Sequence, residues 1–275
     1  SLEVVGFCRS SWGVTLVDVL VRWIYRSCDK ILVSSKGFVA SIQARGVSEE
    51  QILYFPNWVE PVYREISLKE KTGKFFEDLP RGFRVLFAGN IGEPQDFGTI
   101  VAAAERLKPY HDIHWIIAGD GRMAAWAKTA VSSRGLATHF HFIGKYPSEK
   151  MPELFSLADV MLVTLKKDPG LSTFVPGKIQ SYLACGKPIV AALEGEAAHL
   201  IRETGAGLVC PPGDSALLAG EVLKMYQMSS EDRLKMGSRG REYSDKNFDR
   251  SMLFQKLDCW IREADGSFSG NDLKS

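Results

Sequence analysis

The amino-acid sequence predicts an α/β fold, a doubly wound parallel sheet preceded by a partial second α/β unit. Three observations support this prediction. Short apolar runs recur from residue 84 onward, they are apolar on both faces, and amphipathic segments of helix length separate them. Strands of this kind that alternate with helices are typical of a parallel sheet covered by helices on both sides.

The composition of the 275-residue chain is that of an ordinary globular protein, with 45% hydrophobic and 24% charged residues. It has 34 basic and 33 acidic residues, so no overall field draws the chain to nucleic acid or to an anionic membrane. Its five cysteines form no C-x-x-C pair, which argues against a zinc knuckle and a disulfide framework. The sequence has neither a run of about 20 apolar residues nor a signal-peptide pattern, so we expect a cytoplasmic chain.

The first part of the chain predicts a helix at 16–27, a strand at 30–35, a helix at 36–45 and a strand at 51–57. Two strand-and-helix repeats do not enclose a core, so residues 1–65 are expected to be the end of a larger domain or an appendage. Asp18, Arg22 and Arg26 form one polar stripe on an otherwise apolar first helix. That helix is interpreted either as buried with an ion-paired edge or as an exposed surface. Residues 66–80 are polar and predict a linker.

The main domain is predicted at 81–245, with strands at 85–89, 113–119, 139–144, 159–165 and 187–193. After Gly213 the pattern is helical, with helices expected at 216–228, 230–243 and 248–264. Asp214 and Ser229 are the expected N-caps of the first two. Residues 246–265 are predicted to be a crossing helix, and 266–275 a flexible tail.

Glycine-rich turns follow two of the predicted strands. The turn from Gly89 to Gln95 lies where ligands bind in open α/β sheets, although a tight loop without a ligand would look the same. Gly119-Asp120-Gly121-Arg122-Met123-Ala124 matches the dinucleotide fingerprint G-x-G-x-x-G/A, but the next strand ends without the carboxylate that binds ribose. A nicotinamide-dependent dehydrogenase is therefore disfavoured.

A helix start and a pair of histidines complete the candidate sites. Lys178 lies in the first turn of a helix that begins near Pro176, where free N–H groups and a full charge suit a phosphate. His139 and His141 alternate on one strand, but no third ligand is placed to complete a metal site. We therefore expect no metal.

Four stretches in this order resemble the donor-binding half of the family-4 retaining glycosyltransferases of GT-B fold: FAGNIGEPQ, IIAGDGRM, HFIGKYPSEKMPELFSLADVMLVTLK and STFVPGKIQSYLACGKPIVA. The last looks most like the WbuB-like subgroup. IYRSCDKILVSSKGF through ILYFPNW also resembles the end of the family's N-terminal, acceptor-binding domain. The resemblance runs from about Tyr25 to Tyr243.

The resemblance implies transfer of a sugar from a UDP- or GDP-linked nucleotide-sugar, with retention and without a metal or other cofactor. It implies a lipid-linked saccharide as acceptor, in polysaccharide or O-antigen biosynthesis, and therefore a place at the inner face of the membrane for the whole enzyme. Lys178 and Asn90 are the implied catalytic residues. The implied donor-binding residues are Gly89, Gly92, Gln95, Gly119, Gly121, Arg122, Gly144, Lys145, Tyr146, Thr173, Val175, Pro176, Gly177 and Ser181.

The chain departs from the family pattern at four positions. Many members carry Arg and Lys where this chain has Asn90 and Gln95, and two Glu where it has Thr173 and Ser181. These changes indicate a variant site in which Lys178 contacts the leaving group, with Arg122 and Lys145 as weaker candidates.

The same features leave other functions open. The part of the family's acceptor domain that carries its catalytic-region His has no counterpart here, so we expect weak nucleotide-sugar binding and little or no transfer. The alternatives are a non-catalytic nucleotide-sugar binding module and, because of the apolar first helix, a scaffold protein on a Rossmann-like fold.

Overall fold

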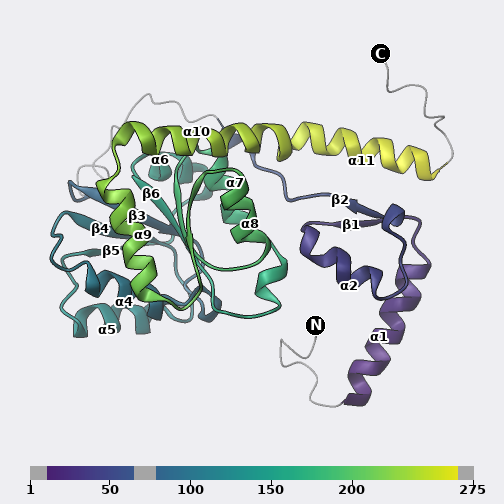
Figure 1. Cartoon of the computed structure of the whole chain (residues 1–275), viewed down its shortest axis with the longest axis horizontal. Coiled ribbons are helices and arrows are strands. Elements are labelled where there is room, and N and C mark those ends of the chain that lie inside the picture. Colours follow the sequence, from purple (N-terminus) through teal and green to yellow (C-terminus); the bar gives the residue numbers. More distant parts are fainter. Residues whose placement is uncertain (1–10, 65–78, 266–275) are drawn as a thin grey trace.

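The computed structural model describes residues 11–64 and 79–265, with side chains from residue 15 onward (Figure 1). The predicted tail, most of the predicted linker and Cys8 lie outside the described residues. Six strands form one all-parallel sheet in the order β5-β4-β3-β6-β7-β8, with helices on both faces. The predicted doubly wound α/β fold is therefore confirmed. The domain boundaries stay a prediction.

Strands and helices alternate from β3 to α9, and two further helices follow α9. The strands are β3 (Phe83–Ala88), β4 (Ile113–Ala118), β5 (Phe140–Gly144), β6 (Val160–Thr164), β7 (Ile189–Ala192) and β8 (Gly207–Cys210). The helices are α4 (Phe97–Arg106), α5 (Ala124–Ser133), α6 (Met151–Ser156), α7 (Gly177–Ala184), α8 (Glu196–Glu203), α9 (Ser215–Gln227), α10 (Ser230–Asn247) and α11 (Arg250–Ala264).

Two of these elements, α8 and β8, were not predicted from the sequence. β8 is a four-residue edge strand, and its short apolar run lies between the turn-forming residues Gly205 and Pro211. The expected caps are confirmed, since the side chains of Asp214 and Ser229 accept backbone N–H groups at the starts of α9 and α10. The last helix begins two residues later than expected because Asp249 caps it.

Alternate residues of each strand enter two separate cores. Val85 and Phe87 pack with α4, α5 and α9, whereas Leu86 and Ala88 pack with α6, α7 and α8 on the other face. Chain order reverses between β3 and β6, which are neighbours in the sheet although two strands separate them in sequence. The carboxyl ends of β3 and β6 therefore border the crevice where open α/β sheets bind their ligands.

A smaller unit precedes the main sheet and contains α1 (Ser11–Arg26), β1 (Ile31–Val33), the 3₁₀ turn η1 (Lys36–Phe38), α2 (Val39–Gln43) and β2 (Ile52–Tyr54). β1 and β2 form a parallel pair. Helix α11 continues from α10 across to this unit, where the ring of Phe254 lies 6.4 Å from that of Phe55 and 5.1 Å from that of Trp58 (Figure 1). The last helix thus contacts the smaller unit, and its assignment as a crossing helix stays a prediction.

The first helix combines both interpretations that its sequence allowed. Asp18 pairs with Arg22 at 2.7 Å and with Arg45 at 3.0 Å, so the ion-paired edge is confirmed. The apolar side is not buried, because Leu16 and Trp23 are 63% and 66% exposed. The interpretation as a buried helix is therefore wrong for this chain. Among the described residues, no helix has the length and apolarity needed to cross a membrane.

Candidate functional site

Three glycines at the carboxyl ends of β3, β4 and β5 bring their loops into direct contact. The N–H of Gly89 donates to the carbonyl of Ala118 at 2.9 Å, and the N–H of Gly119 donates to that of Gly144 at 2.7 Å. A Cβ at Gly119, where φ is +144°, would overlap the carbonyl oxygen of Gly89. The structure thus brings three of the predicted donor-binding glycines together, and at Gly119 the space excludes any side chain.

The amide side chains of Asn90 and Gln95 brace the loop after β3. Gln95 accepts the N–H of Gly92 at 3.1 Å through Oε1. The side chain of Asn90 lies where a Cβ at Gly92 or at Gly121 would come within 2.5 Å and 2.6 Å of it. Asn90 itself is exposed at the rim of the crevice. These two predicted site residues therefore contact the glycines predicted with them.

Lys178 places a cation at the centre of this arrangement. Its Nζ lies 4.1 Å from the centroid of the Phe87 ring, and a Cβ at Gly89 would begin 3.0 Å from it. The residue is half-buried, and burial lowers its pKa to about 8. Within the described residues it has no ion-pair partner. A cation held beside apolar surface without a counter-charge is suited to an anionic ligand.

Lys178 reaches this position because α7 begins at the crevice. Pro176 precedes the helix and offers no side-chain cap, and the N–H of Ile179 already donates to its carbonyl at 2.9 Å, so the N–H groups of Gly177 and Lys178 are the ones without a partner among the described residues. Gly177 is exposed and carries no side chain that could cover them. The helix start thus offers N–H donors next to the Lys178 ammonium.

Two of the other predicted residues face partners that the sequence had not indicated. The Thr173 hydroxyl donates to the carbonyl of Gly170 at 2.8 Å, and its own carbonyl accepts the hydroxyl of Ser35 at 2.7 Å. Ser181 forms a hydrogen bond with Tyr63, whose pKa is raised by burial. Ser35 and Tyr63 both belong to the part of the chain before the main sheet.

The loop after β5 carries the remaining predicted residues. Tyr146 packs against the core that contains α7, and burial raises its pKa. Lys145 is exposed. This loop therefore offers one half-buried ring and one exposed cationic side chain near the Gly119 turn.

A cleft of about 660 Å³ opens beside the crevice. Among the residues predicted from the sequence, Arg122 and Thr173 line it. Sequence reasoning missed its other charged residues, Glu93, Lys166, Lys167 and Asp168. Their positions directly after β3 and β6 were the available signal.

Both missed acids, Glu93 and Asp168, already have partners. The Lys166 ammonium lies 2.9 Å from Oε1 of Glu93 and lowers the pKa of that carboxyl. Asp168 accepts the N–H groups of Gly170 and Leu171 at 2.7 and 3.1 Å. The cations Arg122 and Lys167 have no ion-pair partner within residues 11–64 and 79–265, so the cleft is favourable to an anion.

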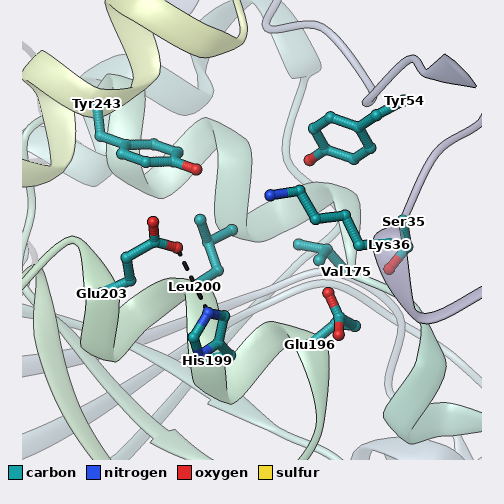
Figure 2. A pocket seen from close by; sticks show the side chains of 9 residues that line it. All are labelled: Ser35, Lys36, Tyr54, Val175, Glu196, His199, Leu200, Glu203 and Tyr243. Carbon is teal, nitrogen blue, oxygen red and sulfur yellow. Dashed lines mark ion pairs between the residues drawn. The ribbon is translucent and has the colours of Figure 1, made fainter.

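A second cavity, of about 30 Å³, lies between the smaller unit and α8 (Figure 2). Lys36 and Tyr54 approach it from the smaller unit, and His199 and Glu203, 3.7 Å apart, from α8. Burial raises the pKa of Tyr54 to about 12. Val175, a predicted donor-binding residue, lines this cavity and not the larger cleft. It has room for about one water molecule and not for a substrate.

The histidines of β5 lie away from the crevice. Nδ1 of His139 is 3.2 Å from the carbonyl oxygen of Ile113, and Nε2 of His141 is 3.3 Å from Nδ1 of His114. In the described part of the chain no three His, Cys, Asp or Glu residues gather in a way that could hold a metal ion.

Comparison with known proteins assigns the family. Residues 71–243, more than half of the chain, match the family model described as "Glycosyl transferases group 1". The chain belongs to the group 1 glycosyl transferases. The glycine loops, α7 and the charged residues that line the cleft all lie within the matched residues of this group 1 glycosyl transferase.

Curated relatives agree with the assignment. This group 1 glycosyl transferase is 27% identical over 266 residues to the probable glycosyltransferase WbjE of Pseudomonas aeruginosa, covering 92% of this chain and 63% of the relative. It is 27% identical over 236 residues to the putative colanic acid biosynthesis glycosyl transferase WcaI of Escherichia coli K12, covering 83% and 56%. The chain thus spans between about half and two thirds of the length of these relatives.

Solved structures share the fold. A glycosyltransferase from Rickettsia africae aligns with a TM-score of 0.76 at 15% identity, over 88% of this chain and 66% of that one. The Anabaena protein HepE, solved with UDP and glucose, aligns with a TM-score of 0.77 at 18% identity, over 90% and 67%. At such identities the likeness shows the GT-B fold alone.

Proposed function

We propose that this chain is the donor-binding part of an enzyme that transfers a sugar from a nucleotide-sugar to a saccharide, with retention and without a metal. The position of Lys178 carries this proposal. Its ammonium has no counter-charge among the residues that the structure describes, and it lies beside the Gly89 loop at the reversal of strand order. A diphosphate placed there would supply the missing negative charge.

The same geometry suits the chemical step. Negative charge builds up on the leaving diphosphate as its bond to the sugar breaks, and fixed donors aimed at that charge lower the barrier. The Lys178 ammonium and the free N–H groups of α7 are such donors, and neither has to move into place. In this arrangement Arg122 lies at the cleft wall, where it would add to the positive field.

Related proteins favour particular substrates. HepE has been solved with UDP and with UDP-glucose, which favours a UDP-linked donor over a GDP-linked one. Names among the curated relatives include colanic acid and amylovoran biosynthesis, which favours a saccharide acceptor in polysaccharide assembly. We further propose a lipid-linked acceptor, a place at the inner membrane face for the whole enzyme, and membership of the WbuB-like subgroup.

A thermal-shift and calorimetry panel of UDP, GDP, ADP, NAD and UDP-glucose tests the proposal. We expect UDP to stabilise the chain and Lys178→Ala to weaken its binding by about tenfold or more. Lys224→Ala is the matched control, because Lys224 is exposed on α9 and pairs only with Glu221. Failure of every nucleotide to bind would refute the proposal, and stabilisation by NAD alone would favour a dehydrogenase.

Measuring both kcat and UDP-glucose affinity in the whole enzyme distinguishes sugar transfer from simple binding. If Lys178 acts on the leaving group, Lys178→Ala lowers kcat more than it weakens UDP-glucose binding. Equal losses would favour the alternative of a non-catalytic nucleotide-sugar binding module.

A further inference from the structure

The two central strands of the sheet separate before the crevice. β3 pairs with β4 from Phe83 to Ala88 but with β6 only at Val85 and Leu86. The N–H of Gly89 faces β4, so the N–H and carbonyl of the preceding Ala88 point to the β6 side. Ala88 is 5% exposed and has no strand partner there. Such a buried peptide unit needs another source of hydrogen bonds.

The hydroxyl of Tyr182 supplies both bonds. It accepts the N–H of Ala88 at 3.1 Å and donates to the Ala88 carbonyl at 3.1 Å. Tyr182 is fully buried, and its ring packs edge-on against Phe155 with centroids 5.2 Å apart. Burial raises the pKa of Tyr182 far above its usual range, so the hydroxyl keeps the proton that it donates.

Tyr182 lies one helical turn after Lys178 on α7, so both side chains leave the same face of the helix. The Lys178 ammonium lies over the Phe87 ring and beside Gly89. The Tyr182 hydroxyl bonds to Ala88, the residue between those two. Three successive residues at the end of β3 are thus tied to a single helix. Helix α7 also carries the free N–H groups proposed to meet the diphosphate.

We propose that Tyr182 is a positioning residue of the donor site. Its hydroxyl replaces the missing strand partner of Ala88 and keeps the Gly89 loop at a constant distance from Lys178 and the start of α7. This inference rests on the proposed function, since it concerns the same site. Without the hydroxyl, Ala88 loses two bonds in a buried environment, and the strand end must shift to find others.

The test compares Tyr182→Phe with Tyr226→Phe. Tyr226 also donates its hydroxyl in a hydrogen bond, to Asp112 at 2.8 Å, but at the opposite end of the sheet. We expect Tyr182→Phe to raise the dissociation constant of UDP about tenfold, roughly the effect of one lost hydrogen bond. Tyr226→Phe should leave it within about twofold, whatever either variant loses in thermal stability.

Amide hydrogen exchange gives a second readout that needs no ligand. In the wild-type protein the N–H of Ala88 should exchange as slowly as those of the paired strand residues, and in Tyr182→Phe at least about tenfold faster. Fast exchange of Ala88 in the wild type would overturn the inference, even if Tyr182→Phe failed to fold.

The two proposals fail in different ways. If the wild type binds no nucleotide, the proposed function fails. If the wild type binds UDP and Tyr182→Phe binds it equally well, the role of Tyr182 fails while the donor site stands.

Discussion

Replacing Lys178 by Met is predicted to stabilise the protein and to weaken nucleotide binding. Near neutral pH the amine is charged in both the folded and the unfolded chain, and the folded chain holds that charge against Phe87 and Gly89 without a counter-ion. Burial lowers its pKa from 10.5 to about 8. At pH 7 this difference corresponds to about 3 kcal/mol of lost stability.

The aromatic ring reduces that penalty. A cation over the face of a phenyl ring gains about 1 to 2 kcal/mol when it is desolvated, so the net advantage of Met is expected to be about 1 to 2 kcal/mol. The stability advantage of Met over Lys should shrink as pH rises. Because the folded pKa is depressed, the unfolded chain binds more protons between pH 8 and 10.5, and the wild type gains stability as pH rises through that window.

Urea unfolding at pH 7 and at pH 9.5, each with and without UDP, measures these effects. Lys178→Met should unfold at higher urea than the wild type at pH 7, show a smaller advantage at pH 9.5, and be stabilised less than the wild type by the same concentration of UDP. Lys167→Met is the control, since Lys167 is exposed and its replacement should change stability by less than about 0.5 kcal/mol. Destabilisation by Lys178→Met at pH 7, or an advantage that does not change with pH, would contradict the reasoning.

Three further predictions concern the loops, the smaller unit and the histidines. Gly119→Ala should lower the free energy of unfolding, measured with urea, by about 2 kcal/mol or more, because the new Cβ would overlap a backbone carbonyl. Gly213→Ala is its control: φ there is +78° and nothing lies within 4 Å of the new Cβ, so only the strain of the positive φ should be seen. Gly37→Ala should lower stability by about 1 to 2 kcal/mol and weaken UDP binding, since its Cβ would lie 2.5 Å from a carbonyl oxygen of the η6 turn (Leu171–Thr173). Burial lowers the pKa values of His114 and His141, so stability should fall as pH drops below about 6.5, and His141→Phe should reduce that slope.

The fold was predictable because most strands of the main sheet are short apolar runs that can be recognised in the sequence without knowing their neighbours. β6 is buried along its whole length and reads as a single apolar run. The convergence of the Gly89, Gly119 and Gly144 loops was also predictable, because the carboxyl ends of parallel strands share one edge of the sheet. β8 was missed because its apolar run is short and lies between Gly205 and Pro211, where the sequence pattern indicates a turn.

The side-chain contacts of the site could not be predicted in the same way. The bond between Ser35 and Thr173 joins residues 138 positions apart, and nothing in either segment indicates the other. The burial of Lys178 depends on where Phe87 places its ring, whereas a lysine in a first helical turn is ordinarily solvated. Such contacts follow from how elements pack, which local patterns do not encode.

One short helix connects the parts of the molecule that a donor would have to bridge. The eight residues of α7 direct Lys178 to the loop after β3, Tyr182 to the end of that strand and Ser181 to Tyr63. The turn just before α7 is bonded to Ser35. The segments before the main sheet therefore contact α7 and its entry loop at two points, and a shift of those segments would reach the Lys178 ammonium through a rigid element. The effect predicted for Gly37→Ala on UDP binding follows from this connection, because that change alters no residue on the wall of the crevice.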